Sequence, residues 1–288
     1  MPRQVQFLIF FTVAVSVTGG VNFFVWTRLV RDAALPPGGR ALGTALLWGL
    51  YGLMIAMLPA GRLLPRSLVS PLAWIGFSYM GLLLLATMVC ATLELPRLLV
   101  LRAAAPEDPE RRRFLARAFA LGAAALTAAL GGTALFGALR RVAVRDIEVK
   151  LTRLPTGLSG LRIVQITDVH IGPTLDGVWL RRVVDQINDL KPDVIAITGD
   201  LVDGSVRELR GHVAALGDLR ARHGVFFVTG NHEYYSGVDE WLAELTRLGI
   251  RALRNEHVTL TVGSDASGRP LQIDLAGVDD YHSDRFPG

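Results

Sequence analysis

The chain has 288 residues, 51% of them hydrophobic, and a mean hydropathy of +0.38, values that argue against a single water-soluble globule. Its charge is divided unevenly: residues 1–145 hold fifteen arginines and five acidic residues, whereas residues 146–288 hold fifteen basic and twenty-one acidic residues. The basic excess lies in short segments between apolar runs, which is typical of membrane topology rather than of nucleic-acid binding. The single cysteine, Cys90, excludes an intrachain disulfide and a cysteine-based metal site.

Four apolar runs without charged residues follow one another in the first half of the chain. They occupy approximately residues 5–27, 41–61, 72–93 and 118–139. Each run is close to the ~20 residues that a helix needs to cross the core of a bilayer. A buried core helix would explain one such run but not four in succession. Their one strongly polar residue away from the ends is Asn22, so they lack the buried carboxylates or histidines of an ion pathway. The sequence therefore predicts an N-terminal anchor of four transmembrane helices over residues 1–145.

The orientation of this anchor depends on the basic residues beside the runs. Nine arginines flank the runs on one side, and six arginines with one lysine flank them on the other. This count weakly favours a second half that lies outside the cytoplasm. Arg111-Arg112-Arg113-Phe114-Leu115 also resembles a twin-arginine export signal, although an ordinary basic flank of a membrane helix has the same composition. We expect the second half of the chain to lie outside the cytoplasm. Whether the arginines at 111–113 form an export signal or an ordinary basic flank stays open.

In the second half, apolar strands alternate with amphipathic helices. Strands are predicted at about 161–167, 194–198 and 225–229, helices at about 180–190, 209–219 and 239–248, and two later strands at about 258–262 and 271–276. Successive strand ends are roughly 30 residues apart, the length of one strand–helix–strand unit. We therefore expect a layered α/β domain with a parallel sheet over residues 146–288.

A polar cluster follows each of the first three strands. Asp168 and His170 follow the first, Asp200 the second, and Asn231 and His232 the third. Ligands bind at the carboxyl ends of parallel strands, so these side chains should converge in space. Carboxylate, imidazole and amide donors suit Mn, Fe or Zn. Two such ions sharing one carboxylate would stabilise the attacking and leaving oxygens of a displacement at phosphorus.

The ordered combination Asp-X-His, Gly-Asp and Gly-Asn-His-Glu resembles the signature of the calcineurin-like metallophosphoesterase superfamily, over residues 161–233. The resemblance implies two divalent metal ions. It implies that Asp168 and His170 bind the first metal, that Asp200 bridges both, and that Asn231 binds the second. His232 would then be the general acid. Glu233 either orients that imidazole or is a solvated loop carboxylate.

The sequence Gly-Asn-His-Glu-Tyr-Tyr at 230–235 and the preceding anchor resemble the bacterial membrane-associated or exported members of the superfamily. The resemblance implies hydrolysis of phosphomonoester, phosphodiester or pyrophosphate bonds at the membrane surface, on substrates that include lipid-linked ones, with the lipid bilayer as a partner and no nucleic acid. Tyr234, Tyr235 and Trp241 could form an apolar rim, although Trp241 also has the spacing of a core residue. A non-catalytic binding or scaffolding module that retains the fold is the alternative, and a transporter is disfavoured by the absence of charge within the spans.

The remaining histidines lack the expected motif. We expect His212 and His223 to lie on the surface, His257 to precede a strand, and His282 to lie in a polar tail. The superfamily completes its site with a further histidine and a Gly-His-X-His motif, and neither follows Asn231. The expectation from this absence is a domain that is C-terminally incomplete and that holds its second metal weakly.

Overall fold

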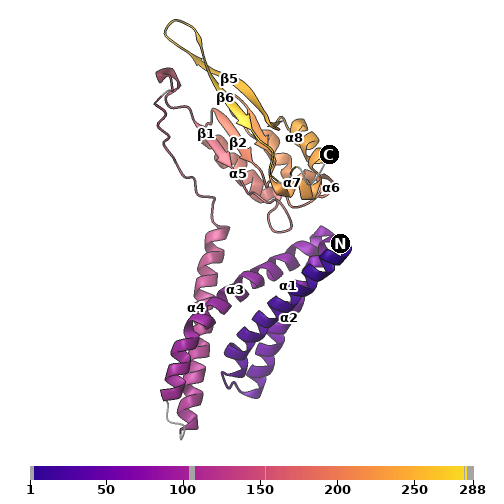
Figure 1. Cartoon of the computed structure of the whole chain (residues 1–288), viewed down its shortest axis with the longest axis vertical. Coiled ribbons are helices and arrows are strands. Elements are labelled where there is room, and N and C mark those ends of the chain that lie inside the picture. The colour runs from indigo at the N-terminus through magenta and orange to yellow at the C-terminus, as the bar shows by residue number, and fades with distance from the viewer. Residues whose placement is uncertain (1–2, 104–107, 153, 282, 284–288) are drawn as a thin grey trace. The chain divides into compact units, whose positions relative to one another are not determined.

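The computed structural model describes the chain except for residues 1–2, 104–107, 153, 282 and 284–288 (Figure 1). His282 is therefore outside the described residues. The chain divides into two compact units, Met1–Arg141 and Val142–Gly288. The boundary expected from the sequence, between residues 145 and 146, stays a prediction.

The first unit consists of helices. They are α1 (Arg3–Trp26), which continues into a π-helical turn at Thr27–Arg31, α2 (Pro37–Leu63), α3 (Arg66–Ala103) and α4 (Pro109–Leu139). Four segments within them are long and apolar enough to cross a membrane, namely Leu8–Arg31, Pro37–Met57, Leu68–Ala103 and Pro109–Ala138. The prediction of four N-terminal membrane helices is confirmed with respect to their length and hydropathy.

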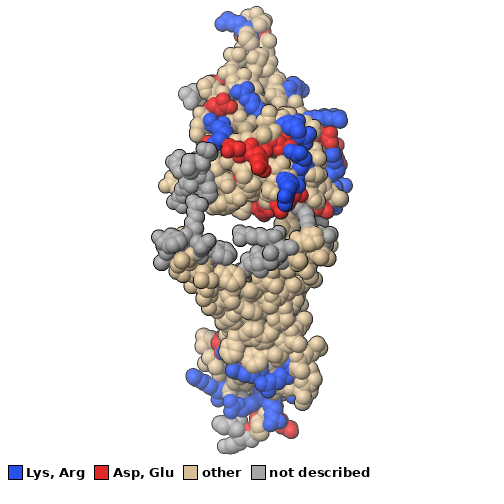
Figure 2. All heavy atoms as spheres, turned by 90° about the vertical axis from the view of Figure 1, so that its right-hand side faces the viewer, with Lys and Arg blue, Asp and Glu red and all other residues tan. Residues whose placement is uncertain are grey.

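The helices extend beyond the charge-free runs because they include their basic flanks. The three consecutive arginines at 111–113 belong to the first turns of α4, and the Asp108 side chain accepts a hydrogen bond from the Arg111 main-chain N–H at 2.9 Å. This is an N-cap, which satisfies an N–H group that has no partner within the helix. In Figure 2 the visible face of the helical unit is uncharged along its middle, and charged side chains are seen at its lower end.

Polar contacts tie α1, α2 and α3 together. Asn22 is fully buried, and its side-chain oxygen accepts a hydrogen bond from the Tyr79 hydroxyl. That hydroxyl also lies 3.1 Å from the Leu47 carbonyl oxygen. Hydrogen bonds between helices contribute to the stability of membrane bundles together with van der Waals packing, because lipid removes most of the hydrophobic driving force. The one strongly polar residue noted within the spans thus joins helices.

The second unit contains a parallel sheet in the order β1-β2-β3-β4. The strands are β1 (Ile163–Ile166), β2 (Val194–Thr198), β3 (Val225–Val228) and β4 (Arg251–Ala252). The connecting helices are α5 (Gly177–Asp189), α6 (Val206–Val213), α7 (Asn231–Ser236) and α8 (Val238–Arg247). All three strand pairs are parallel, which confirms the predicted α/β class. Strand β4 was not predicted, because two residues are too short to show a period.

Alternate residues of the sheet enter two hydrophobic cores. Ile195 and Phe227 pack with the apolar faces of α5, α6 and α8, including the fully buried Trp241. Val194 and Phe226 pack instead with residues of an antiparallel hairpin, β5 (Glu256–Ser264) and β6 (Pro270–Gly277). The sheet therefore lies between a helical layer and a β-hairpin, and the carboxyl ends of its strands lie along one edge.

Candidate metal centre

The polar clusters predicted to converge do meet at the carboxyl edge of the sheet. Side-chain donor atoms of Asp168, His170 and Asp200 all lie within 4.8 Å of one another. In the structure the side-chain oxygen of Asn231 faces both carboxylate oxygens of Asp200, an arrangement that a cation between them would favour. With the amide turned, its nitrogen would lie 3.2 Å from both carboxylate oxygens and donate to them. The oxygen and imidazole donors present fit Mn, Fe or Zn.

The main chain at three of these residues is left-handed. The φ angles are 52° at Asp168, 50° at His170 and 50° at Asp200. Such residues cost about 1–3 kcal/mol each and cluster at functional sites. Hydrogen bonds across the strand ends maintain them, since the His170 N–H donates to the Asp200 carbonyl oxygen at 3.0 Å. The backbone therefore positions the donors before any ion binds.

Two glycines let the ends of β2 and β3 approach each other. Gly199 has a φ of +80°, and a Cβ on it would lie 2.6 Å from the Gly230 nitrogen. A Cβ on Gly230 would lie 2.5 Å from the Asp200 nitrogen and closer still to its carboxylate. Side chains at these positions would displace Asp200, so close approach requires both glycines, and the positive φ of Gly199 is a second requirement at that position.

Glu233 has a role that differs from both sequence interpretations. Its side chain is buried and accepts main-chain N–H groups from Asp200 at 3.0 Å, Leu201 at 2.8 Å and Gly230 at 2.8 Å. Burial raises the pKa of Glu233, and these three hydrogen bonds only partly oppose the rise. Glu233 is therefore buried rather than solvated, and it is not the partner of the His232 imidazole. Its hydrogen bonds instead link the two strand ends.

Asp203, which the sequence analysis did not single out, is the partner of both site histidines. Its Oδ1 atom lies 3.1 Å from Nδ1 of His170 and 2.6 Å from Nδ1 of His232. A carboxylate only accepts hydrogen bonds, so both Nδ1 atoms carry protons and each Nε2 is left for a metal or a substrate. An aspartate three residues after Asp200 in a loop is too common a feature to be recognised from sequence alone.

The carboxylates also determine the charge of His170. Burial lowers the pKa of this imidazole, but the hydrogen bond to Asp203 and the nearby charges of Asp203, Asp200 and Asp168 together outweigh burial, and the pKa is raised. The site is therefore a cluster rich in carboxylates, which attracts cations.

The aromatic residues after the motif have different environments. Tyr235 is 61% exposed, and its ring lies edge-on to His232 with centroids 5.8 Å apart. Tyr234 and Trp241 are buried, so of the three aromatic residues considered for an apolar rim only Tyr235 is exposed. The Trp241 Nε1–H donates to the Gly204 carbonyl oxygen at 3.0 Å, in agreement with its core spacing.

Two histidines expected on the surface are instead partly buried. His212 accepts a hydrogen bond from the Gly177 N–H at 3.1 Å, and so joins α6 to the start of α5. His223 is also half-buried, because its main-chain N–H pairs with Asp193 beside the sheet. His257 is exposed at the start of β5.

A parallel sheet with aspartate, histidine and asparagine donors at its carboxyl edge defines a class of metal-binding α/β domain. Residues 161–281 match the calcineurin-like phosphoesterase family. The resemblance stated from the sequence is thereby confirmed.

Similar proteins are found in animals and bacteria. A "transmembrane protein with metallophosphoesterase domain" from Danio rerio is 39% identical over 170 residues, covering 57% of this chain and 37% of that protein. The protein of the same name from Bos taurus is 40% identical over 183 residues, covering 63% and 40%. An uncharacterized metallophosphoesterase, YkuE of Bacillus subtilis, is 32% identical over 175 residues, covering 59% of each. The chain thus spans about two fifths of the first two relatives. No solved structure matches it significantly.

Proposed function

We propose that the α/β unit hydrolyses phosphate esters with two divalent metal ions. The observation that carries this proposal is the convergence of Asp168, His170, Asp200 and Asn231 at one sheet edge. Asp168 and His170 would hold the first ion, Asp200 would bridge, and Asn231 would hold the second. The ions would supply Lewis-acid stabilisation of the phosphoryl oxygens and activation of water.

His232 is proposed to act on the leaving group. With Nδ1 held by Asp203, its Nε2 is the atom able to give a proton to a departing alkoxide. The hydrogen bond to Asp203 would orient the ring for this role. Replacement His232→Ala should leave metal content nearly unchanged and lower turnover most for poor leaving groups, because good ones need no proton. Loss of bound metal in this variant would instead make His232 a ligand.

The proposed substrates are phosphomonoesters, phosphodiesters or pyrophosphates close to a membrane, including lipid-linked ones. The four candidate spans and the transmembrane relatives support this location. We further propose that the α/β unit lies outside the cytoplasm, from the arginine count and the Arg111–Leu115 motif. A reporter that is active only in the cytoplasm, fused after Gly288, should then be silent, and an active reporter would reverse the orientation.

The decisive comparison is Asp200→Asn against Asp185→Asn. Both changes replace a carboxylate with an amide, but Asp185 is exposed on α5 and outside the candidate site. We expect Asp200→Asn to lose metal and at least 100-fold in Mn²⁺-dependent turnover of a chromogenic phosphodiester, and Asp185→Asn to keep both. Equal effects would remove the dinuclear assignment. Metal binding without any turnover by the parent chain would favour the non-catalytic module.

A further inference from the structure

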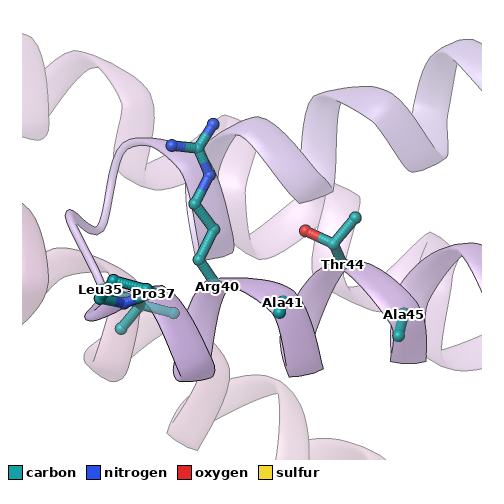
Figure 3. A pocket seen from close by; sticks show the side chains of 6 residues that line it. All are labelled: Leu35, Pro37, Arg40, Ala41, Thr44 and Ala45. Atoms are coloured by element: carbon teal, nitrogen blue, oxygen red, sulfur yellow. The ribbon is translucent and has the colours of Figure 1, made fainter.

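A hollow of about 600 Å³ lies beside the start of α2 in the helical unit. It is lined by Leu35, Pro37, Arg40, Ala41, Thr44 and Ala45, among which Arg40 is the charged residue. Figure 3 shows the Arg40 side chain extended away from α2, on the same side of the helix as Thr44. The lining therefore combines one cation with a mainly apolar surface.

Small residues form the floor of the hollow. Ala41 and Ala45 are one helical turn apart and exposed, and they leave space where larger side chains would fill it. The adjacent residues Leu42 and Leu46 are 71% and 57% exposed, so this face of α2 is apolar and uncovered. The Thr44 hydroxyl accepts a hydrogen bond from the Trp26 Nε1–H at 2.9 Å. This bond holds the part of α2 that lines the hollow next to α1.

The position of Arg40 at the start of a candidate span suits contact with a lipid headgroup. The candidate span begins at Pro37, so Arg40 lies in its first turn. At this level of a bilayer a basic side chain meets phosphate groups, while residues further along the span meet acyl chains. The hollow runs from Leu35 to Ala45 and so covers both levels.

Positive charge at this end of the unit is not fully compensated. Asp32 and Glu94 are shared by three arginines, Arg28, Arg31 and Arg97, with nitrogen–oxygen distances from 2.7 to 3.5 Å. Arg40 has no ion pair within the described part of the chain. Three guanidinium groups on two carboxylates, plus Arg40, leave two positive charges that an anion would complement.

A further guanidinium lies beside the hollow. Arg117 of α4 donates through Nε and Nη2 to the Ala34 carbonyl oxygen at 3.2 and 2.8 Å. Ala34 directly precedes Leu35 of the lining, and Arg117 pairs there with a carbonyl oxygen rather than a carboxylate. This contact places a third uncompensated positive charge next to the site.

We propose that this hollow binds an anionic phospholipid, with the headgroup phosphate on Arg40 and an acyl chain over Ala41 and Ala45. An apolar floor, a neighbouring lipid-exposed face and an unpaired cation at headgroup level together match this ligand better than a free anion. The site lies in the helical unit and does not depend on the proposed hydrolysis.

The test measures phosphatidylglycerol and phosphatidylcholine binding to the full purified chain in detergent, by native mass spectrometry. Arg40→Gln removes the headgroup contact, and Arg102→Gln is the matched control, because Arg102 is an exposed arginine of α3 that does not line the hollow. Ala45→Leu fills the floor without changing charge. Circular dichroism and gel filtration confirm that each variant keeps its helices and its size.

We expect phosphatidylglycerol to bind in preference to phosphatidylcholine, and Arg40→Gln to weaken it about fivefold, the equivalent of about 1 kcal/mol for one arginine. Ala45→Leu should weaken both lipids, and Arg102→Gln should have little effect. Excess inorganic phosphate should not displace the lipid, since it lacks the acyl chain. Equal loss in Arg40→Gln and Arg102→Gln, equal binding of the two lipids, displacement by phosphate, or an Ala45→Leu variant that binds normally would each overturn the proposal.

Discussion

The Glu233 carboxylate accepts the main-chain N–H of Asp200 at 3.0 Å, from one strand end to the next. The same carboxylate accepts the N–H of Gly230, which precedes the proposed ligand Asn231. One buried side chain thus fixes the spacing between two donors without contacting a metal itself. Small shifts of such supporting residues strongly affect a site.

Replacement Glu233→Gln should weaken the hydrogen bonds by which this side chain links the two strand ends. An amide has one acceptor oxygen, so its NH₂ group would face a main-chain N–H that the carboxylate satisfied. We expect a loss of about 1–3 kcal/mol in stability and about 10–100-fold weaker metal binding, measured by thermal unfolding and metal titration. Glu240→Gln, at an exposed position in α8, is the control. Unchanged metal affinity in Glu233→Gln would show that the hydrogen bonds of Glu233 do not position the proposed ligands.

Asp203→Asn should impair both site histidines at once. An amide oxygen can accept from His170 or His232, but its NH₂ group cannot accept from either. We expect turnover to fall about 10–100-fold and its pH profile to change, because the hydrogen bond and charge of Asp203 raise the pKa of His170 and would be weakened or lost. Measurement of turnover against pH, with Asp185→Asn as the control, checks this expectation. A parallel profile with unchanged metal content would show that Asp203 does not orient these rings.

Gly230→Ala should damage the site through Asp200. The added Cβ would lie 2.5 Å from the Asp200 nitrogen, so the two strand ends would have to separate. A shift of about 1 Å in a catalytic group can cost about 100-fold in rate. Gly211→Ala in α6 adds the same atom where nothing lies within 4 Å. Turnover should therefore fall in Gly230→Ala and persist in Gly211→Ala, and similar rates for both would contradict the close approach.

Glu244 should make the packing of α6 against α8 sensitive to acid. Its buried carboxylate lies 3.1 Å from Arg210 and 2.6 Å from Arg247. The Arg247 hydrogen bond is the main cause that lowers the pKa of Glu244, against a smaller opposing effect of burial. A lowered folded-state pKa gives stability that is complete above the unfolded pKa, near 4.5 for glutamate, and is lost as pH falls through the folded value.

Hydrogen exchange of α8 measures this contribution. We expect Glu244→Gln to speed exchange about tenfold at pH 7, since a charged hydrogen-bonded group is lost. The difference from the parent chain should begin to shrink below pH 4.5, where the unfolded-state glutamate takes up a proton, and disappear as the pH falls through the lowered folded-state pKa. Asp239→Asn, at an exposed position in the same helix, is the control. A difference that stays constant with pH would mean that Glu244 acts through its shape and not its charge.

The sequence predicted those parts of the fold that are carried by local patterns. Strand β2 was predicted at its observed residues because five consecutive apolar or β-branched residues are bounded by Pro192-Asp193 and Gly199. Strand β4 was missed because its pairing with β3 depends on tertiary contacts and not on a periodic pattern of apolar residues in the sequence. The charge-free runs indicated the membrane helices but not their extension into basic flanks, which form helix without being apolar.

The same division applies to the candidate site. Asp168, Asp200 and Asn231 stand at strand ends, so their convergence follows from topology. Asp203 and Glu233 act through contacts with residues about thirty positions away, at His170 and at Asp200. Glu233 belongs to the Gly-Asn-His-Glu motif, but the motif does not show which groups its carboxylate contacts, and no local pattern distinguishes Asp203 from a solvated loop residue.

The left-handed backbone at Asp168, His170 and Asp200 sets a trade-off between stability and activity. Hydrogen bonds across the strand ends hold these conformations, so the fold carries their cost before any metal binds. Glycine adopts this region without strain. A chain with Asp168→Gly should therefore resist heat better than its parent in the absence of metal while losing a ligand, and relaxation of this edge would be the easiest way for the domain to gain stability at the expense of its chemistry.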